Sequence, residues 1–383
     1  MDRLPFRATL SEYRRQADAL LSGWNAGEET SIRFVWQQHP RFRRPDVRWL
    51  PKEMQTSAIV ADAMDEADAR LVIARWYDFR DWAALQDWVE AVTEDGSPVS
   101  RFETAVEAVI NGDTAGLDRS LREDPDLVRA RSTRVTWWAP HQMHRATLLH
   151  YVAANGIEGY RQKTPANAVE IAATLLRAGA EVDALADMYE GRYTTMSMLV
   201  SSGHPANAGL QVALTETLLD FGAAVDGLGE GVWTPPLMTA LAFGYLDTAE
   251  ALVRRGARIP TVAAAAGLGR ISDVRRLLPA AAPDDRHRAM ALAAQHGHVD
   301  VVRMLLDEGE DPNRYNPEGN HAHSTPLHQA VFAGKDAVVR LLVERGARLD
   351  VRDTIYDGTP LGWAEHCGQP EIAAYLRAQG APD

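Results

Sequence analysis

Residues 325–349 read TPLHQAVFAGKDAVVRLLVERGARL, and this stretch decides the fold prediction for the chain. Its Thr-Pro pair favours the start of a short apolar helix, because proline is tolerated in the first helical turn. Gly334 favours the end of that helix, since glycine readily adopts the left-handed backbone that closes many helices. A second helix follows, with valines and leucines at helical spacing, and Gly346 ends it. The stretch therefore predicts a helix-turn-helix unit.

The unit recurs at Thr359, 34 positions after Thr325, as TPLGWAEHCGQPEIAAYLRAQGA. A period of about 33 residues is typical of ankyrin arrays. On these residues the chain resembles the ankyrin repeat family, and the resemblance implies an all-α solenoid that acts by surface recognition. Glycines expected to close the first helices, each in a left-handed conformation, are Gly156, Gly203, Gly244, Gly269, Gly297, Gly334 and Gly368.

About eight helix-turn-helix repeats are expected in residues 99–383. Seven begin from about residue 146, with second helices predicted at 168–176, 211–219, 246–253, 272–278, 299–306, 336–343 and 370–376. An atypical repeat precedes them, with helices over 102–110 and 114–121, because a terminal repeat must cap the stacked core. Uneven glycine spacing indicates insertions near 157–167 and 204–211, each between the two helices of a repeat. Such insertions emerge on one face of a solenoid, often the binding face.

Residues 1–98 do not fit the repeat and predict a small Trp-rich helical module. Helices are expected at 10–24, 31–38, 61–76 and 82–92, the last capped by Asp81. Six of the ten tryptophans lie here, and core packing is the favoured role for them. The stretch ADARLVIARWYDFRDWAALQDWVEAV resembles a helical element that precedes ankyrin arrays in some bacterial proteins.

The amino-acid composition limits the classes of partner and the compartment to be expected for this chain. The formal net charge of −13 disfavours nucleic acid, because phosphate binding needs clustered Lys and Arg. The strip Arg41, Arg43, Arg44 and Arg48 is either a solvated basic stretch or an anion site. Cys367 is the single cysteine, which excludes an intrachain disulfide and indicates a reducing compartment. With no signal-peptide pattern and no apolar run of about 18 residues, we expect a cytoplasmic protein without membrane contact or cofactor.

The resemblance also implies a concave groove, formed by the finger loops between repeats and by the residues just before the closing glycines. The candidate groove residues are Trp137, Trp138, His141, Tyr160, Arg161, Lys163, Asp187, Tyr189, Arg192, Trp233, Phe243, His296, His323, Phe332 and His366.

Two groups of these residues have two interpretations each. Trp137 and Trp138 are ligand anchors or packing between fingers. Tyr160, Arg161 and Lys163 form an anion site on a projecting loop, or close that loop by contacts to Glu158, Asp187 or backbone carbonyls. The pairs His141 with His144 and His321 with His323 have the spacing of metal ligands but lack a third ligand, so no metal site is expected. At the TPLH position, His150 and His328 are expected to bond the finger backbone, as in the family.

The favoured function is a non-enzymatic scaffold that binds a protein segment or a small molecule in the groove. The alternative is an enzyme or small-molecule-binding protein with its site under the irregular fingers of the first repeats. Acid–base chemistry of a lyase, isomerase or cyclase in a bacterial biosynthetic pathway is one example, with His296, His366, His323, Asp187 and Tyr189 as candidate groups. The sequence contains none of the common hydrolase, nucleotide-binding or metalloprotease motifs.

Overall fold

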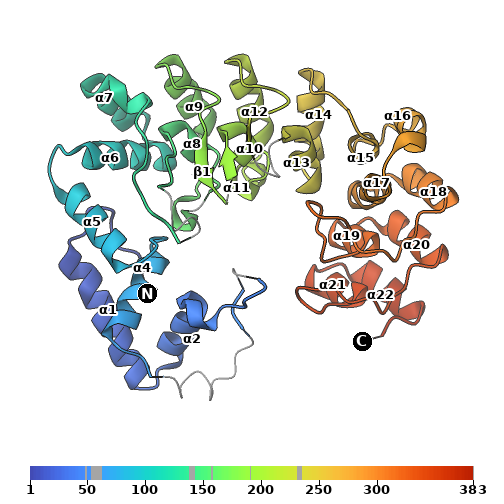
Figure 1. Ribbon diagram of the computed structural model, residues 1–383, viewed down its shortest axis with the longest axis horizontal. Coiled ribbons are helices and arrows are strands. Elements are labelled where there is room, and N and C mark those ends of the chain that lie inside the picture. Colours follow the sequence, from blue (N-terminus) through green and yellow to red (C-terminus); the bar gives the residue numbers. More distant parts are fainter. Residues whose placement is uncertain are drawn as a thin grey trace. The chain divides into compact units, whose positions relative to one another are not determined.

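The computed structural model describes residues 1–47, 50–52, 63–137, 143–156, 158–189, 191–230 and 235–382. The chain divides into two compact units. The first, called the N-terminal unit, comprises Met1–Ala223 and Leu228–Gly231. The second, the C-terminal unit, comprises Ala224–Gly227 and Val232–Asp383. Both are built almost entirely from helices, as expected (Figure 1).

The described residues at the start of the N-terminal unit form the α-helices α1 (Leu10–Asn25), α2 (Glu29–Gln38), α4 (Glu66–Trp76) and α5 (Trp82–Thr93), and the 3-10 turn η1 (Pro40–Phe42). Asp81 caps α5 as predicted, because its Oδ1 accepts from the Ala84 N–H at 2.9 Å. Helix α4 starts later than expected, at an Asp65 capping box. The core of these helices includes Trp24 and Trp88, while Trp36, Trp76 and Trp82 are partly buried against it.

Three helix pairs follow in the same unit. They are α6 (Pro98–Asn111) with α7 (Thr114–Glu123), α8 (Leu148–Val152) with α9 (Ala168–Arg177), and α10 (Thr195–Leu199) with α12 (Gln211–Asp220). Short 3-10 turns lie at η2 (Pro125–Val128) and η3 (Gly159–Arg161). Between the helices of the last two pairs lie η3, within the first expected insertion, and a short helix α11 (Gly203–Asn207), which overlaps the second.

The prediction that Gly203 closes a helix was wrong. Helix α10 ends earlier, with Val200 as its C-cap, and Ser202 is the extended N-cap of α11, so Gly203 is the first residue of a new helix. The other six closing glycines all have positive φ, as the capping argument requires.

A small antiparallel sheet joins two finger loops of the N-terminal unit, in the order β1 (Ala186–Met188), β2 (Gly191–Tyr193), β3 (Gly229–Glu230). Asp187 pairs with Arg192 across its first two strands. The sequence analysis expected no strands, because segments of two or three residues are too short to show a period.

The C-terminal unit contains five helix pairs. They are α13 (Pro236–Ala242) with α14 (Leu246–Arg254), α15 (Val262–Gly267) with α16 (Ile271–Leu277) and η4 (Leu278–Ala280), α17 (Pro283–His296) with α18 (Val299–Asp307), α19 (Pro326–Phe332) with α20 (Asp336–Glu344), and α21 (Pro360–His366) with α22 (Pro370–Ala378). Among the described residues this gives eight pairs, the number predicted.

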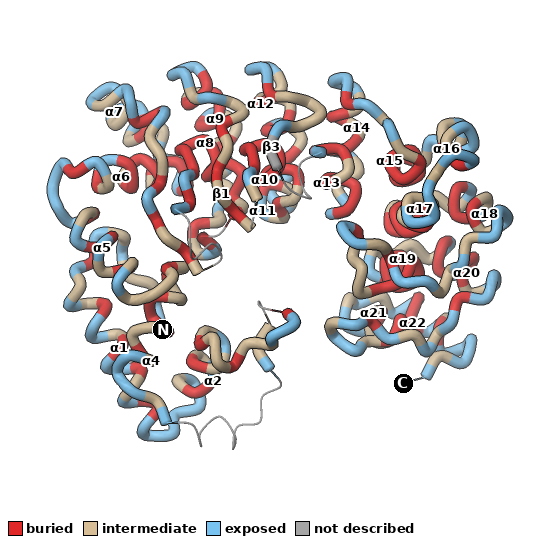
Figure 2. The backbone as a smooth tube through the Cα atoms, viewed as in Figure 1, coloured by how far each residue is buried: buried red, intermediate tan, exposed pale blue. Residues whose placement is uncertain are grey.

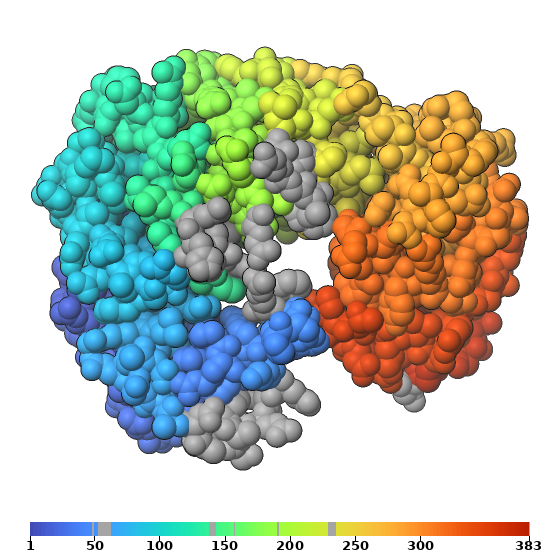
Figure 3. Space-filling model, viewed as in Figure 1, coloured from blue at the N-terminus to red at the C-terminus, as the bar shows by residue number. Residues whose placement is uncertain are grey.

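In the C-terminal unit, the first helices α15, α17 and α19 each pack between the first helices of the neighbouring pairs. Figure 2 shows α15 and α17 buried along most of their length, and Figure 3 shows α17 to α22 packed in sequence order. Helix α15 achieves this with small side chains, because Ala263, Ala264, Ala265 and Ala266 are all fully buried. A Cβ added at Gly267 would lie only 3.1 Å from a Leu241 methyl group, so the packing there leaves no spare room.

Candidate functional site

The N-terminal unit contains a buried ionic cluster of two arginines and two glutamates. The side chains of Arg134, Arg161, Glu103 and Glu158 are each at most 3% exposed. Arg161 Nη1 lies 2.5 Å from Glu103 Oε2 and 3.2 Å from Glu158 Oε2. Arg134 lies 3.5 Å from Glu103 and 3.4 Å from Glu158. Each carboxylate therefore faces both guanidinium groups, which is the arrangement that lets charges remain buried.

Aromatic side chains complete the cluster and tie it to the N-terminal helices. The Trp88 Nε1–H donates to Glu103 Oε1 at 3.1 Å. Arg134 donates to the Tyr160 hydroxyl at 2.6 Å, and its guanidinium carbon lies 4.6 Å from the ring centre of Phe79 and 4.4 Å from that of Trp88. Trp88 of α5 and Tyr160 of the first insertion therefore both contact charged side chains of the cluster.

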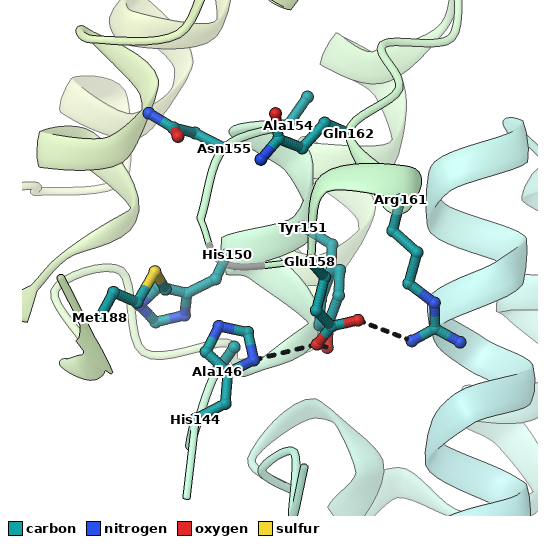
Figure 4. A pocket seen from close by; sticks show the side chains of 10 residues that line it. All are labelled: His144, Ala146, His150, Tyr151, Ala154, Asn155, Glu158, Arg161, Gln162 and Met188. Carbon is teal, nitrogen blue, oxygen red and sulfur yellow. Dashed lines mark hydrogen bonds and ion pairs between the residues drawn. The ribbon is translucent and has the colours of Figure 1, made fainter. Parts of the chain in front are cut away.

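A small recess opens beside the cluster (Figure 4). His144 Nδ1 lies 3.0 Å from Glu158 Oε1, and the Tyr151 hydroxyl donates to the same oxygen at 2.8 Å. A histidine, a carboxylate and a phenol in contact are the groups that acid–base catalysis uses. The recess, however, has a volume of about 10 Å³, which is room for one water molecule.

Two groups of the cluster, Glu158 and Arg161, remain charged near neutral pH. Burial alone would raise the pKa of Glu158, but Arg134 and Arg161 hold that pKa well below its usual range. Conversely, the pKa of Arg161 is raised. Burial alone would lower it, but the neighbouring carboxylates together have the larger effect. Glu158 and Arg161 therefore act as fixed charges, not as proton carriers.

Asp78 behaves differently. It occupies the turn between α4 and α5 with a φ of 63°, and its Oδ2 is buried without a hydrogen-bond partner. Burial raises the pKa of Asp78 to about 7, and the nearby charge of Glu158 adds to this, although Arg3 opposes it. Asp78 is thus a buried acid that is only partly ionised near neutral pH.

We expect Asp78→Asn to stabilise the N-terminal unit by about 1–3 kcal/mol near pH 8. Between pH 3.8 and about 7 the folded chain keeps a proton that the unfolded chain has lost, so the acid costs stability as pH rises. Asparagine removes this cost and tolerates the positive φ. Urea unfolding near pH 5 and pH 8 should show the larger gain at the higher pH. The exposed Asp87→Asn is the control, and a loss of stability in the Asp78 variant would contradict the argument.

The first insertion does not project as the anion-site interpretation required. The Arg161 side chain is 1% exposed and faces the carboxylates of Glu103, Glu107 and Glu158. Lys163 is exposed, and its Nζ donates to Asn111 Oδ1 at 3.2 Å. The insertion folds back onto α6, so Arg161 makes a loop-closing contact to Glu158, the alternative stated from the sequence.

The β1–β2 finger places its predicted residues around the same insertion. Tyr189 donates its hydroxyl proton to the Gly156 carbonyl at 2.6 Å, and burial raises the pKa of Tyr189 to about 12. Asp187 lies 4.0 Å from both Arg145 and Arg192. Trp137 lies apart from them, beside arginines of the N-terminal helices. Trp138, His141 and Trp233 lie outside the described residues.

A second recess, of about 490 Å³, lies in the C-terminal unit and is called the aromatic recess. Its lining residues are Phe332, Tyr356, Gly358, Gly362, Trp363, His366 and Cys367. Phe332 is 58% exposed and Tyr356 is 60% exposed. Trp363 is held in place in the same recess, because its Nε1–H donates to Asp353 Oδ2 at 2.9 Å and its ring centre lies 6.1 Å from that of Phe332.

The finger loop beside the aromatic recess is shaped by Asp353. Its carboxylate accepts from the backbone N–H groups of Ile355, Tyr356 and Gly358 at 2.7–3.0 Å. The predicted residue His323 lies 3.5 Å from Asp353, and its ring centre is 5.8 Å from that of Trp363. Of the predicted groove residues, Phe332 and His366 therefore line this recess, and His323 lies beside its Trp363.

Two other predicted groove residues lie on different helices of this unit. His296 Nε2 lies 2.9 Å from the Leu241 carbonyl, and burial lowers the pKa of His296 to about 4. Phe243 is the C-cap of α13 and is 38% exposed.

Sequence reasoning missed Glu103, Arg134, Asp353 and Trp363. One signal was available for the last of these. The histidine of the TPLH pattern is replaced by Gly362 in the final repeat, and a bulky indole follows directly.

Comparison with known proteins agrees with this architecture. The ankyrin repeat profile matches residues 289–317 and 323–354, which contain most of α17, all of α18, and the α19–α20 pair. Human cyclin-dependent kinase inhibitor 2A is 36% identical over 121 residues, covering 30% of this chain and 75% of that protein. The chain belongs to the ankyrin repeat family.

Other ankyrin proteins match more loosely. Ankyrin repeat and KH domain-containing protein mask-1 of Caenorhabditis elegans is 27% identical over 220 residues, which are 55% of this chain but 8% of that protein. The crystal structure of the human ASB11 ankyrin repeat domain is 20% identical, with a TM-score of 0.36, and covers 73% of this chain and 98% of that one.

The ankyrin histidines have the structural role that the family resemblance implied. His328 Nδ1 lies 2.9 Å from Thr325 Oγ1, and its Nε2 lies 3.2 Å from the Gly358 carbonyl of the next finger. His150 repeats this geometry with Thr147 and the Tyr193 carbonyl. Within the described ranges, no three His, Cys, Asp or Glu side chains are grouped as metal ligands. No helix in those ranges is long and apolar enough to cross a membrane.

Proposed function

We propose that this ankyrin protein is a binding scaffold that receives an apolar side chain of a partner protein in the aromatic recess. The observation that carries the proposal is that two exposed rings, Phe332 and Tyr356, line one recess together with a fixed Trp363. Large aromatic side chains supply most of the energy at protein interfaces, and they are seldom left exposed without a use.

The aromatic recess also suits partner binding because it is rigid and has a polar side chain among its lining residues. The Asp353 carboxylate holds both the indole of Trp363 and the finger backbone, so little order has to be gained on binding. The exposed polar side chain of His366 lines the recess together with the rings. An apolar centre with a polar rim is the usual anatomy of a protein interface.

The relatives support the same class of function. Cyclin-dependent kinase inhibitor 2A acts, by its name, on a protein, and the chain covers three quarters of its length at 36% identity. An enzymatic role for His144 and Glu158 would need a substrate beside them, and the recess there has a volume of about 10 Å³. The single cysteine leads us to place the scaffold in the reducing cytoplasm.

The double variant Phe332→Ala with Tyr356→Ala should weaken partner binding by about 2 kcal/mol or more, roughly 30-fold, because both rings are lost from the centre of the interface. The control is Phe221→Ala, which removes an exposed ring that is 39% accessible at the end of α12. Partners captured by wild type and by the control are purified, and their affinity for all three proteins is measured.

A partner that binds the double variant as tightly as wild type would refute the aromatic recess as the binding site. Unchanged thermal unfolding of the double variant is required for the comparison, and the exposure of both rings leads us to expect it.

A further inference from the structure

A basic recess of about 460 Å³ lies in the N-terminal unit. We call it the basic recess. Its lining residues are Pro40, Arg41, Arg43, Arg44, Pro45, Lys52, Arg75 and Trp137. It contains three arginines of the basic strip noted in the sequence, and the structure adds Lys52 and Arg75 to them.

Three separate segments build the recess. After η1, Arg43 forms an isolated antiparallel β-bridge with Pro51, and the Lys52 N–H donates to the Phe42 carbonyl at 2.7 Å. These contacts place Lys52 beside the arginine strip. Arg75 comes from the last turn of α4. Trp137 lies on the finger loop between η2 and α8, called the first finger. The Arg80 N–H donates to the Val135 carbonyl of this loop at 3.0 Å. The site is therefore assembled by the fold and does not depend on one flexible basic stretch.

The indole of Trp137 lies close to two of the cations. Its ring centre is 5.9 Å from the guanidinium carbon of Arg43 and 5.4 Å from that of Arg75. Contact with an aromatic ring orients guanidinium groups without neutralising them. The two arginines are close enough to repel each other, since Arg43 contributes to lowering the pKa of Arg75 after the larger effect of burial.

The carboxylates nearby are engaged with other arginines of the recess. Arg41 Nη2 lies 2.5 Å from Asp68 Oδ2, and Arg44 Nη2 lies 2.6 Å from Asp46 Oδ2. Among the described residues, Arg75 makes no ion pair; Asp81 acts on it only at longer range, and its Nε is buried without a hydrogen-bond partner. A partly desolvated cation without a close counter-ion is costly, and an added anion would remove that cost.

The geometry points to the basic recess as a binding site for the phosphate group of a small phosphorylated molecule. Arginine presents a planar fork that matches phosphate oxygens, and Lys52 adds a point charge at the same opening. A compact recess of this volume suits a small molecule. The net charge of −13 opposes the long polyanionic backbone of a nucleic acid.

Calorimetric titration with inorganic pyrophosphate tests the assignment on the full chain. Wild type should bind pyrophosphate, and Arg75→Gln should bind it at least about tenfold more weakly, the loss expected for a charged hydrogen-bond donor. Arg75→Lys keeps the charge but not the fork, so its affinity should fall between the two. The matched control is Arg70→Gln, on the same helix, which also lies beside a tryptophan, Trp82, but pairs with Glu66.

Equal pyrophosphate affinity in wild type and Arg75→Gln would overturn the assignment. So would heat changes that sodium chloride reproduces at the same ionic strength, because they would report screening alone. Binding to phosphatidylserine vesicles without binding of pyrophosphate would show a membrane-surface patch and would also overturn it. If Arg75→Gln fails to fold, the comparison of Arg75→Lys with Arg70→Gln decides the question.

Discussion

Replacing Arg161 with methionine should lower the free energy of unfolding of the N-terminal unit by about 3–5 kcal/mol, the usual cost of removing one partner from a buried ion pair. Glu103 and Glu158 would then share Arg134 alone, with side chains that are at most 3% exposed. Methionine matches the length of the lost side chain, so the effect would come from charge more than from a cavity. Urea unfolding followed by tryptophan fluorescence measures it.

Two further variants separate charge from packing. Arg33→Met removes a surface partner of Glu29 and should leave the transition unchanged within error, because exposed ion pairs contribute little. Adding Glu103→Gln to Arg161→Met removes one uncompensated carboxylate and should recover part of the loss. An Arg161→Met variant as stable as Arg33→Met would mean that the cluster is hydrated and contributes no buried charge.

Acidification from about pH 7 to about pH 5 should cost each unit about 2 kcal/mol through its buried repeat histidine. Burial lowers the pKa of His150 to about 3 and that of His328 to about 4, from the ordinary histidine value of 6.5. Between those values the unfolded chain binds a proton that the folded chain excludes, so stability is lost as pH falls below about 6.5. His150 reports on the N-terminal unit and His328 on the C-terminal unit.

The variant His328→Gln tests this directly. It should be less stable than wild type near pH 7, because the bonds to Thr325 and Gly358 are weakened, but its stability should depend less on pH between about 5 and 7. Unfolding curves at several pH values measure both effects. The exposed His204→Gln is the control and should retain the wild-type slope. An unchanged slope in His328→Gln would show that another group causes the acid sensitivity.

The sequence was sufficient for most of the fold. The second helices lie within two residues of their predicted bounds, because each repeat carries its own start and stop signals in adjacent residues. The prediction for Gly203 was wrong because a glycine that begins a short proline-containing helix shows the same local pattern as a glycine that closes a helix. The boundary near residue 98 stays a prediction: α1 to α5 lie in the same compact unit as the first three helix pairs.

The sites were less predictable. Glu103, Arg134 and Glu158 come together from a helix, a finger loop and an insertion, and no local pattern links positions so far apart. The aromatic recess was partly foreseen, since Phe332 and His366 follow from the repeat period, whereas Trp363 does not. The roles of Trp138, His141 and Trp233 stay predictions.

The shared charges of the ionic cluster also bear on how this part of the molecule folds. In a plain repeat array each repeat contacts only its neighbours, so the ends can unravel one repeat at a time. Here α6, the first finger and the first insertion enclose charges that are stable only when all are in place. Trp88 joins α5 to the same assembly. Partial unfolding at this end would expose unbalanced buried charge, so these segments form a single cooperative step.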